Sequence, residues 1–303
     1  MSKTIVETGK VVDPYQASGG IFRLPRSGEH REDDYSSTSF DTLRDMQARH
    51  FWYRGRSRFL RHALKRCLVH DLETQTPRMI DIGCGCGGWI SDVSRIIKPT
   101  EAELAVADSS EKALEYAADI LPDEVNCYKV NLLDMQWHNR WDIIFLLDVL
   151  EHLQDDRQAA KQAYDALSPG GLLFVSMPAL SAFWTWNDEL AHHKRRYARR
   201  DLEKLAEETG FILRDSRYFM FFLSPLLIVS RWLTNRKVAK SSPDAARDVS
   251  KAMHQVPHPV VNGVLRSVFS GETPLGHLIR FPWGTSIFGL FQKPPAVREE
   301  LPT

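Results

Sequence analysis

Two short segments of the sequence carry side chains that could move a proton. The segment DVLEHL places Asp148, Glu151 and His152 within five residues, and the segment HHKRRY begins with His192 and His193. An imidazole can accept a proton near neutral pH, so a histidine in either segment is a candidate general base. We therefore predict a catalytic group made of Glu151, His152 and His193.

Three interpretations of His152 stay open at this level. It could be the general base, or it could bind a divalent metal together with the carboxylates beside it, because such ions accept mixed carboxylate and imidazole donors. It could also lie at the start of a helix, where Glu151 and Asp155 would suit the positive end of the helix dipole. No residue is assigned to a metal, because either His192 or His193 could be the distant ligand.

The stretch MIDIGCGCGGWI ends an apolar run in a turn that is mostly glycine. Gly83, Gly85 and Gly88 satisfy the pattern G-x-G-x-x-G, which lets a backbone approach a nucleotide closely. The same glycines could serve only a tight turn with positive φ. Asp108, which closes the stretch LAVAD, could accept hydrogen bonds from both ribose hydroxyls or could cap the next helix. We expect a ligand that contains an adenosine-like sugar.

The elements that must position these residues alternate between strand and helix patterns. Apolar runs predict strands at 78–83, 103–107, 126–131, 142–147, 171–177 and 211–219. Amphipathic runs predict helices near 88–97, 110–119, 155–168 and 199–209. Runs such as DIIFLL are apolar throughout, which is typical of strands covered on both faces. The alternation predicts an open α/β sheet with crossover helices.

Composition divides the rest of the chain around a core predicted at 78–219. Residues 1–40 are polar and are predicted to be a disordered tail, and 41–77 to form a helical cap. The segment 220–284 is predicted to be a mostly helical insertion, followed by a closing strand at 285–295. The apolar run YFMFFLSPLLIVSRWL, at the start of the insertion, could be buried against the sheet, form a pocket lid or contact a membrane surface.

The motifs between 78 and 178 resemble, in order, those of class I S-adenosylmethionine-dependent methyltransferases. They are MIDIGCGCGGWI, LAVADSS, VNLLDMQW, WDIIFLLDVLEHL and LSPGGLLFVSMP. The resemblance implies a Rossmann-like, seven-stranded, doubly wound sheet whose last strand is antiparallel, with S-adenosyl-L-methionine across the ends of strands one, two and four. HFWYRGR, WNDELAHHKRRY and FPWGTSIFGLFQKP more loosely resemble bacterial type 11 or 12 methyltransferases. The D-x-x-E-H pattern is similar to that of ubiquinone-pathway O-methyltransferases and small-RNA 2′-O-methyltransferases, although Asp148 stands where those groups often have Glu.

The resemblance implies a set of cofactor-binding residues. Gly83 and Gly85 would pass under the methionine part, and Asp81 would help to hold its amino group. Asp108 would hold the ribose. Asp134, with Leu133 beside it, would meet the adenine, and Leu147 would lie near the sulfonium. The full set is Asp81, Gly83, Gly85, Asp108, Ser109, Leu133, Asp134 and Leu147. Either Arg54 or Arg56 would reach the cofactor carboxylate. The run HHKRRYARR could be a further anion site or a solvated charge run.

The predicted function is methyl transfer, with O-methylation of a small, partly apolar acceptor as the leading form. The acceptor could be aromatic, quinone-like or lipid-linked. An NAD enzyme would share the glycine pattern but would place no demand on the four later motifs. RNA methylation is disfavoured because 39 Lys and Arg balance 39 Asp and Glu, so no nucleic acid partner is expected. A non-catalytic subunit that binds S-adenosylmethionine stays an alternative.

Cysteine usage and the N-terminal sequence indicate the compartment. The four cysteines form no C-x-x-C motif, the N-terminus has no apolar signal-peptide core, and no run reaches the roughly 20 apolar residues that span a bilayer. We expect a cytoplasmic protein, with peripheral membrane contact through 218–233 as an option.

Overall fold

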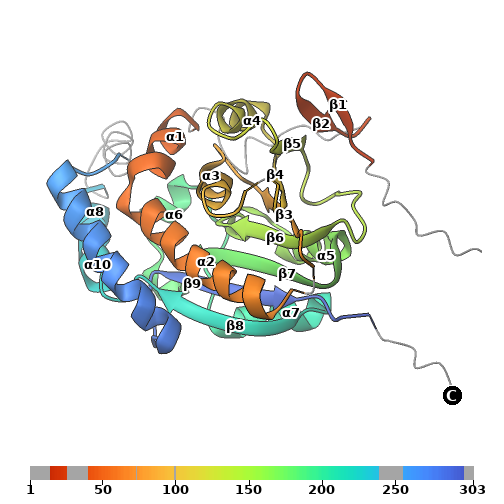
Figure 1. Cartoon of the computed structure of the whole chain (residues 1–303). Helices are drawn as coiled ribbons and strands as arrows, with labels where there is room; N and C mark the ends of the chain where they lie inside the picture. Colours follow the sequence, from red (N-terminus) through yellow and green to blue (C-terminus); the bar gives the residue numbers. More distant parts are fainter. Residues whose placement is uncertain (1–13, 26–39, 73, 99, 239–254, 297–303) are drawn as a thin grey trace, which may run out of the picture.

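The computed structural model describes residues 14–25, 40–72, 74–98, 100–238 and 255–296. These residues form a nine-stranded sheet with helices on both faces (Figure 1). The strands are β1 (Gln16–Ser18), β2 (Ile21–Arg23), β3 (Arg78–Ile82), β4 (Glu103–Asp108), β5 (Asn126–Lys129), β6 (Trp141–Leu147), β7 (Leu167–Pro178), β8 (Ile212–Phe219) and β9 (Ser286–Gln292).

The helices fall between the strands, as the alternation of sequence patterns predicts. They are α1 (Phe40–Arg49), α2 (Phe51–His70), α3 (Gly88–Ser94), α4 (Glu111–Ala118), α5 (Asp156–Ala166), α6 (Trp186–Leu190), α7 (Arg199–Thr209), α8 (Ser224–Val238) and α10 (Pro259–Leu278), with short 3-10 turns η2 (Leu150–His152) and η3 (Ser181–Phe183). No helix in the described ranges has the length and apolar content needed to cross a bilayer.

The sheet confirms the predicted Rossmann-like class and corrects its strand count. The strand order is β1-β2-β5-β4-β3-β6-β7-β9-β8, and β9 runs antiparallel to both β7 and β8. In sheet order, the seven strands β5-β4-β3-β6-β7-β9-β8 correspond to those that the resemblance implies. Two more extend the edge, because β2 pairs with β5 and β1 pairs with β2.

The two extra strands come from the segment predicted to be a disordered tail. Residues 16–18 and 21–23 each form a three-residue strand, too short to give the apolar run by which the longer strands were predicted. Tyr15 anchors the hairpin because its ring lies 4.6 Å from that of Trp137 and 5.6 Å from that of Tyr128. Residues 1–13 and 26–39 of the predicted tail lie outside the described residues.

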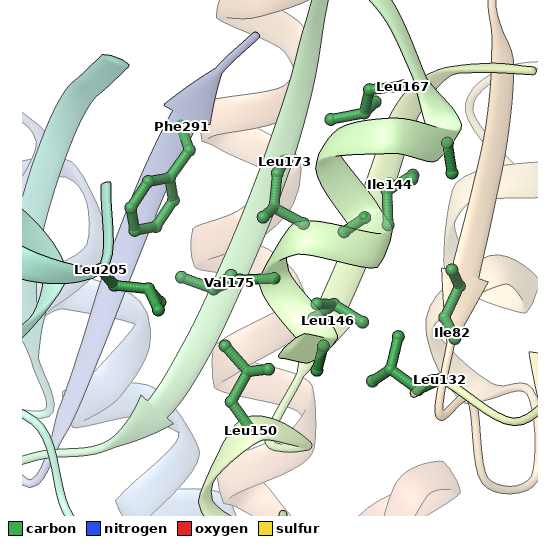
Figure 2. Close-up of a cluster of buried hydrophobic side chains, with 14 of the residues drawn as sticks. Ile82, Leu132, Ile144, Leu146, Leu150, Leu167, Leu173, Val175, Leu205 and Phe291 are labelled. Atoms are coloured by element: carbon green, nitrogen blue, oxygen red, sulfur yellow. The ribbon is translucent and has the colours of Figure 1, made fainter. Parts of the chain in front are cut away.

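The core lies on both faces of the sheet. Alternate residues of β6 point to opposite sides: Ile144 and Leu146 pack in one cluster, and Ile143, Phe145 and Leu147 pack in the other. Figure 2 shows the first cluster, where Ile144 and Leu146 lie near Leu173 and Val175 of β7, and Phe291 of β9 lies beyond β7. Each fully buried aliphatic side chain stabilises the folded state by about 1.5–3 kcal/mol relative to leaving it exposed to water. Burial on both faces explains why these strands are apolar throughout.

Helix α2 covers one face of the sheet, and α10 packs against α2 (Figure 1). The contact is tight at Gly55, where a Cβ atom would lie 2.0 Å from the ring of Phe269. Asn262 of α10 accepts a hydrogen bond from the backbone N–H of Phe51 and donates one to the carbonyl of Arg49. These bonds join α10 to the junction of α1 and α2. The predicted insertion therefore holds the N-terminal helices in place.

Candidate active site

The glycine turn after β3 has the geometry that requires glycine. Gly83 and Gly85 have φ values of +75° and +54°. A Cβ atom at Gly83 would lie 2.5 Å from the side chain of Val149, and one at Gly85 would lie 2.8 Å from Leu43. The backbone N–H of Gly83 is bonded to the carbonyl of Ala107 at 2.8 Å, which fixes the turn against β4. Side chains larger than hydrogen are therefore excluded here by both conformation and space.

Helix α1, which lies in the segment predicted to form a helical cap, covers this turn. Gln47 accepts a hydrogen bond from the N–H of Gly88 at 3.2 Å, and its amide nitrogen lies 3.4 Å from the carbonyl oxygen of Cys84. Phe40 and Leu43 of the same helix line the cavity above the turn. Nothing in the pattern of α1 marks Gln47, because one glutamine in a polar helix is usually solvated.

Two carboxylates flank the turn. Asp108 is 9% exposed; one of its oxygens accepts from the N–H of Gly85 at 3.0 Å and the other from the N–H of Ser110 at 2.9 Å. Asp81 is 2% exposed, and its Oδ1 has no hydrogen-bond partner in the part of the chain that the structure describes. Burial raises the pKa of Asp81 to about 7, although the charge of Arg56 opposes the rise. A buried oxygen without a donor is rare in proteins, so Asp81 is suited to a donor from a ligand.

One cavity of about 380 Å³ brings the two predicted groups of residues together. It opens at the carboxyl ends of β3, β4 and β6, where open α/β sheets bind their ligands. The predicted residues that line it are Asp81, Gly83, Gly85, Asp108, Ser109, Leu133, Leu147, Glu151, His152 and His193.

Asp134 is the predicted site residue that the structure does not bring to the cavity. Its side chain is exposed and accepts a hydrogen bond from Gln136 at 2.7 Å, whereas the neighbouring Leu133 lines the wall. Of these two consecutive residues, only Leu133 lines the cavity. The sequence placed both at the adenine because it could not fix the direction of the turn.

The structure distinguishes between Arg54 and Arg56, the two arginines between which the sequence could not choose. Arg54 donates to both carboxylate oxygens of Asp92, at 2.9 and 3.0 Å. Arg56 lines the cavity and forms an ion pair with Asp148. Burial raises the pKa of Asp148, and the charge of Arg56 opposes that rise. Arg56 is therefore the arginine that can meet a cofactor carboxylate.

His193 is held by a buried aspartate that the sequence analysis did not single out. The Nδ1 atom of His193 lies 2.9 Å from Oδ1 of Asp188, whose two oxygens also accept from Arg196 at 2.8 and 3.0 Å. Although burial opposes it, hydrogen bonds from His193 and Arg196 hold the pKa of Asp188 well below its usual value. An ionised acceptor at Nδ1 places the ring proton there and leaves the lone pair on Nε2. His192, by contrast, is exposed and lies outside the cavity wall.

His152 and Glu151 lie beside His193. The two imidazole rings are 4.9 Å apart and nearly perpendicular. Glu151 is 1% exposed, and burial, with the negative charge of Asp148 second, raises its pKa well above the usual value. One ligand atom from each of Glu151, His152 and His193 lies within 4.8 Å of the others, a set competent to bind a divalent metal.

The sequence leaves the run HHKRRYARR open between an anion site and a solvated charge run, and its Arg195 and Arg196 instead pair with carboxylates of the fold. Arg195 donates to the carboxylate of Asp156 at 2.7 Å, and Arg196 is fully engaged with Asp188 and the carbonyl of Ala179. Both charges are neutralised inside the fold. They hold the segment against β7 and thereby position His193.

A model of the methyltransferase domain family matches residues 51–215, more than half of the chain. The chain belongs to this family. The matched range runs from the start of α2 to within β8 and includes the glycine turn and the histidine cluster.

The curated relatives have different reactions in their names. The chain is 30% identical over 109 residues to the ubiquinone biosynthesis O-methyltransferase of Bradyrhizobium diazoefficiens, a match that covers 33% of this chain and 39% of that protein. It is 28% identical over 148 residues to the carboxy-S-adenosyl-L-methionine synthase of Trichodesmium erythraeum, covering 45% of this chain and 58% of that protein. The chain thus spans about half the length of the curated relatives it matches.

Solved structures support the fold. A protein of Galdieria sulphuraria described as a candidate sarcosine dimethylglycine methyltransferase superposes with a TM-score of 0.51 at 16% identity, covering 77% of this chain and 83% of that one. The cyclase SpnF superposes with a TM-score of 0.53 at 17% identity, covering 89% of this chain and all of that one. Since a fold can serve several reactions, the reaction must be argued from the site.

Proposed function

We propose that the protein transfers a methyl group from S-adenosylmethionine to an oxygen of a small, partly apolar acceptor. The observation that carries this proposal is a single cavity with a glycine turn and paired aspartates in one part and an aspartate-oriented histidine in another. The first part suits a nucleoside with an amino acid attached, and the second suits a hydroxyl group that must lose its proton.

Four groups would hold the cofactor. The ribose hydroxyls would donate to Asp108, beside Ser109, and the ammonium group would donate to Oδ1 of Asp81. Arg56 would meet the carboxylate of the methionine part. Leu133 and Leu147 would supply apolar contacts to the adenine and near the sulfonium. These residues fit the group because Asp81 offers a buried acceptor atom and a Cβ atom at either glycine would clash.

His193 would act as the general base. When bound, S-adenosylmethionine supplies a methyl group for in-line displacement, in which the acceptor oxygen forms its bond as the sulfur–carbon bond breaks. The Nε2 atom of His193 would take the hydroxyl proton, and Asp188 would stabilise the imidazolium. The neighbouring His152 and Glu151 would form the wall of the cavity next to the acceptor hydroxyl. A divalent metal on these three groups is the alternative, and full activity in the presence of a chelator would exclude it.

We predict that cofactor binding releases a proton at Asp81. At pH 6 the free carboxyl, with a pKa of about 7, is mostly protonated, and an ammonium group beside it would favour the charged form. Binding of S-adenosylhomocysteine should therefore release about 0.9 proton at pH 6, and affinity should rise about tenfold from pH 6 to pH 8. Calorimetry in two buffers of different ionisation enthalpy measures the release.

The matched control for this measurement is Asp81→Asn, which has no proton to release. Its affinity should be weak and nearly independent of pH. A release of the same size in Asp81→Asn, or none in the unchanged protein, would show that Asp81 does not hold the amino group.

The acceptor would be aromatic, quinone-like or lipid-linked, and the surface next to the cavity supports this. Of the large apolar side chains exposed in the described residues, all but Val69, Ile120 and Ile212 lie between 222 and 283, on and around α8 and α10. We call this surface the apolar face. Helix α8 has no acidic residue, and the single one of α10, Glu272, is buried. Such a surface, with exposed Arg236 and Arg266, suits an anionic membrane.

Peripheral membrane contact can be tested by sedimentation with vesicles. The protein should bind phosphatidylglycerol vesicles more strongly than phosphatidylcholine vesicles. Val264→Glu, on the apolar face, should reduce the bound fraction several-fold, because a charge would have to enter the headgroup region. The control Val69→Glu changes a still more exposed valine, on α2, and should bind normally. Equal binding by both variants would contradict membrane contact through this face.

The function itself is tested by incubating the protein with S-adenosylmethionine and panels of hydroxylated aromatic, quinol and lipid-linked compounds. A product heavier by one methyl group, together with S-adenosylhomocysteine, is expected. Methylation of RNA but of no small molecule would favour the RNA methyltransferase alternative. Tight cofactor binding without any turnover would favour a non-catalytic subunit.

A further inference from the structure

Arg231, on α8, lines the cavity in the neighbourhood of Arg196 and Asp188. The structure records no hydrogen bond or ion pair between Arg231 and any of the described residues. The nearby carboxylate, Asp188, is already occupied, because its two oxygens accept from Arg196, His193 and Thr185. Burial lowers the pKa of Arg231 and the like charge of Arg196 lowers it further, whereas the charge of Asp188 opposes the fall. A guanidinium in such a place needs an anion from outside the chain.

Other polar groups of the cavity wall lie in the same region. Thr285 and Ser286, at the start of β9, line the cavity, as does Asn187 of α6. The carbonyl of Thr285 accepts from the N–H of Ala179, whose own carbonyl accepts from Arg196. Within the described residues, the side chains of Asn187, Thr285 and Ser286 form no hydrogen bond. Two hydroxyls and an amide therefore line the same cavity as the guanidinium and are available to an oxyanion bound there.

The carboxylates that pair with the other two arginines of the cavity are not available to Arg231. Arg56 is paired with Asp148, and Arg196 is paired with Asp188. No ion pair within the described residues joins the buried Glu151 to Arg231. Of the strong cations on the described wall, Arg231 is thus the one without a partner.

We propose that Arg231 binds an oxyanion of the methyl acceptor, a carboxylate or a phosphate. The acceptor is then an amphiphile with one negative group near the reacting hydroxyl and an apolar remainder. The proposal rests on the proposed function, since it assigns the acceptor to the part of the cavity that also contains His193. It makes Arg231 a specificity-determining residue that acts on acceptor binding rather than on the cofactor.

The test measures binding of defined anions to the protein saturated with S-adenosylhomocysteine. Phenyl phosphate and benzoate should bind at least about tenfold more tightly than benzyl alcohol, and Arg231→Met should remove that preference. Arg231→Lys should retain part of it. The control Arg157→Met removes an exposed arginine of α5 that pairs with Glu208 away from the cavity, and should behave as the unchanged protein. Comparison of phenyl phosphate with decyl phosphate tells a small soluble anion from a lipid headgroup.

Two results would overturn the proposal. The first is equal binding of anions and benzyl alcohol by the unchanged protein, or a preference for anions that survives in Arg231→Met. The second is a loss of S-adenosylhomocysteine affinity in Arg231→Met as large as the loss for phenyl phosphate, which would assign the guanidinium to the cofactor. Either result leaves the proposed function standing. Failure of the unchanged protein to bind S-adenosylhomocysteine would instead reject the proposed function itself.

Discussion

Replacing Asp108 by alanine is expected to weaken the binding of S-adenosylhomocysteine by about 100-fold. The carboxylate would accept hydrogen bonds from both ribose hydroxyls, and charge-assisted hydrogen bonds contribute about 1.5–3 kcal/mol each. Asp108 also accepts from the N–H of Gly85, so its removal loosens the turn under the cofactor. Calorimetry measures the affinity, and a thermal unfolding curve of each variant checks that the protein is folded.

Two further variants sharpen this measurement. Asp108→Asn keeps one oxygen acceptor and should lose affinity to an intermediate extent. Asp119→Ala removes an exposed aspartate whose partner is Arg44 and should bind normally. An affinity of Asp108→Ala within about threefold of the unchanged protein would mean that Asp108 only caps the start of α4 and shapes the turn.

The second large effect is expected at His193. His193→Ala should slow methyl transfer by about 10² to 10⁴-fold, the usual contribution of a general base, while S-adenosylhomocysteine affinity changes little. Added imidazole should restore part of the rate, which a purely structural residue would not allow. The measurement is the rate of product formation with an acceptor found in the panel.

The matched control is His192→Ala, because His192 is the next residue but is exposed. It should retain nearly full activity. A larger loss in His152→Ala than in His193→Ala would transfer the role of base to His152. A rate abolished by a chelator and restored by a divalent metal would replace the base with a metal centre formed by Glu151, His152 and His193.

The strands of the core could be predicted from sequence because both of their faces are buried. Runs such as 142–147 contain no polar residue after Asp142, and the structure places β6 at Trp141–Leu147. The hairpin β1–β2 could not be predicted in this way. Its strands are three residues long and depend on pairing with β5, a contact between residues about a hundred positions apart.

The histidine cluster was predictable only in part. The segment from 148 to 152 ends at the cavity because it follows β6, and this could be inferred from the order of strands. The approach of His193 depends on the ion pair between Asp188 and Arg196, which holds the intervening chain. Neither residue stands out in sequence, because an arginine in a basic run is usually solvated. Arg231 was missed for a different reason, because a single arginine within an apolar run does not reveal which way its side chain faces.

The most direct test of the account is a crystal structure of the protein with S-adenosylhomocysteine. We predict the ribose on Asp108, the amino group on Asp81 and the sulfur facing His193 across the same cavity. The ligand bound elsewhere on the molecule, or in this cavity with its ribose away from Asp108, would contradict the account.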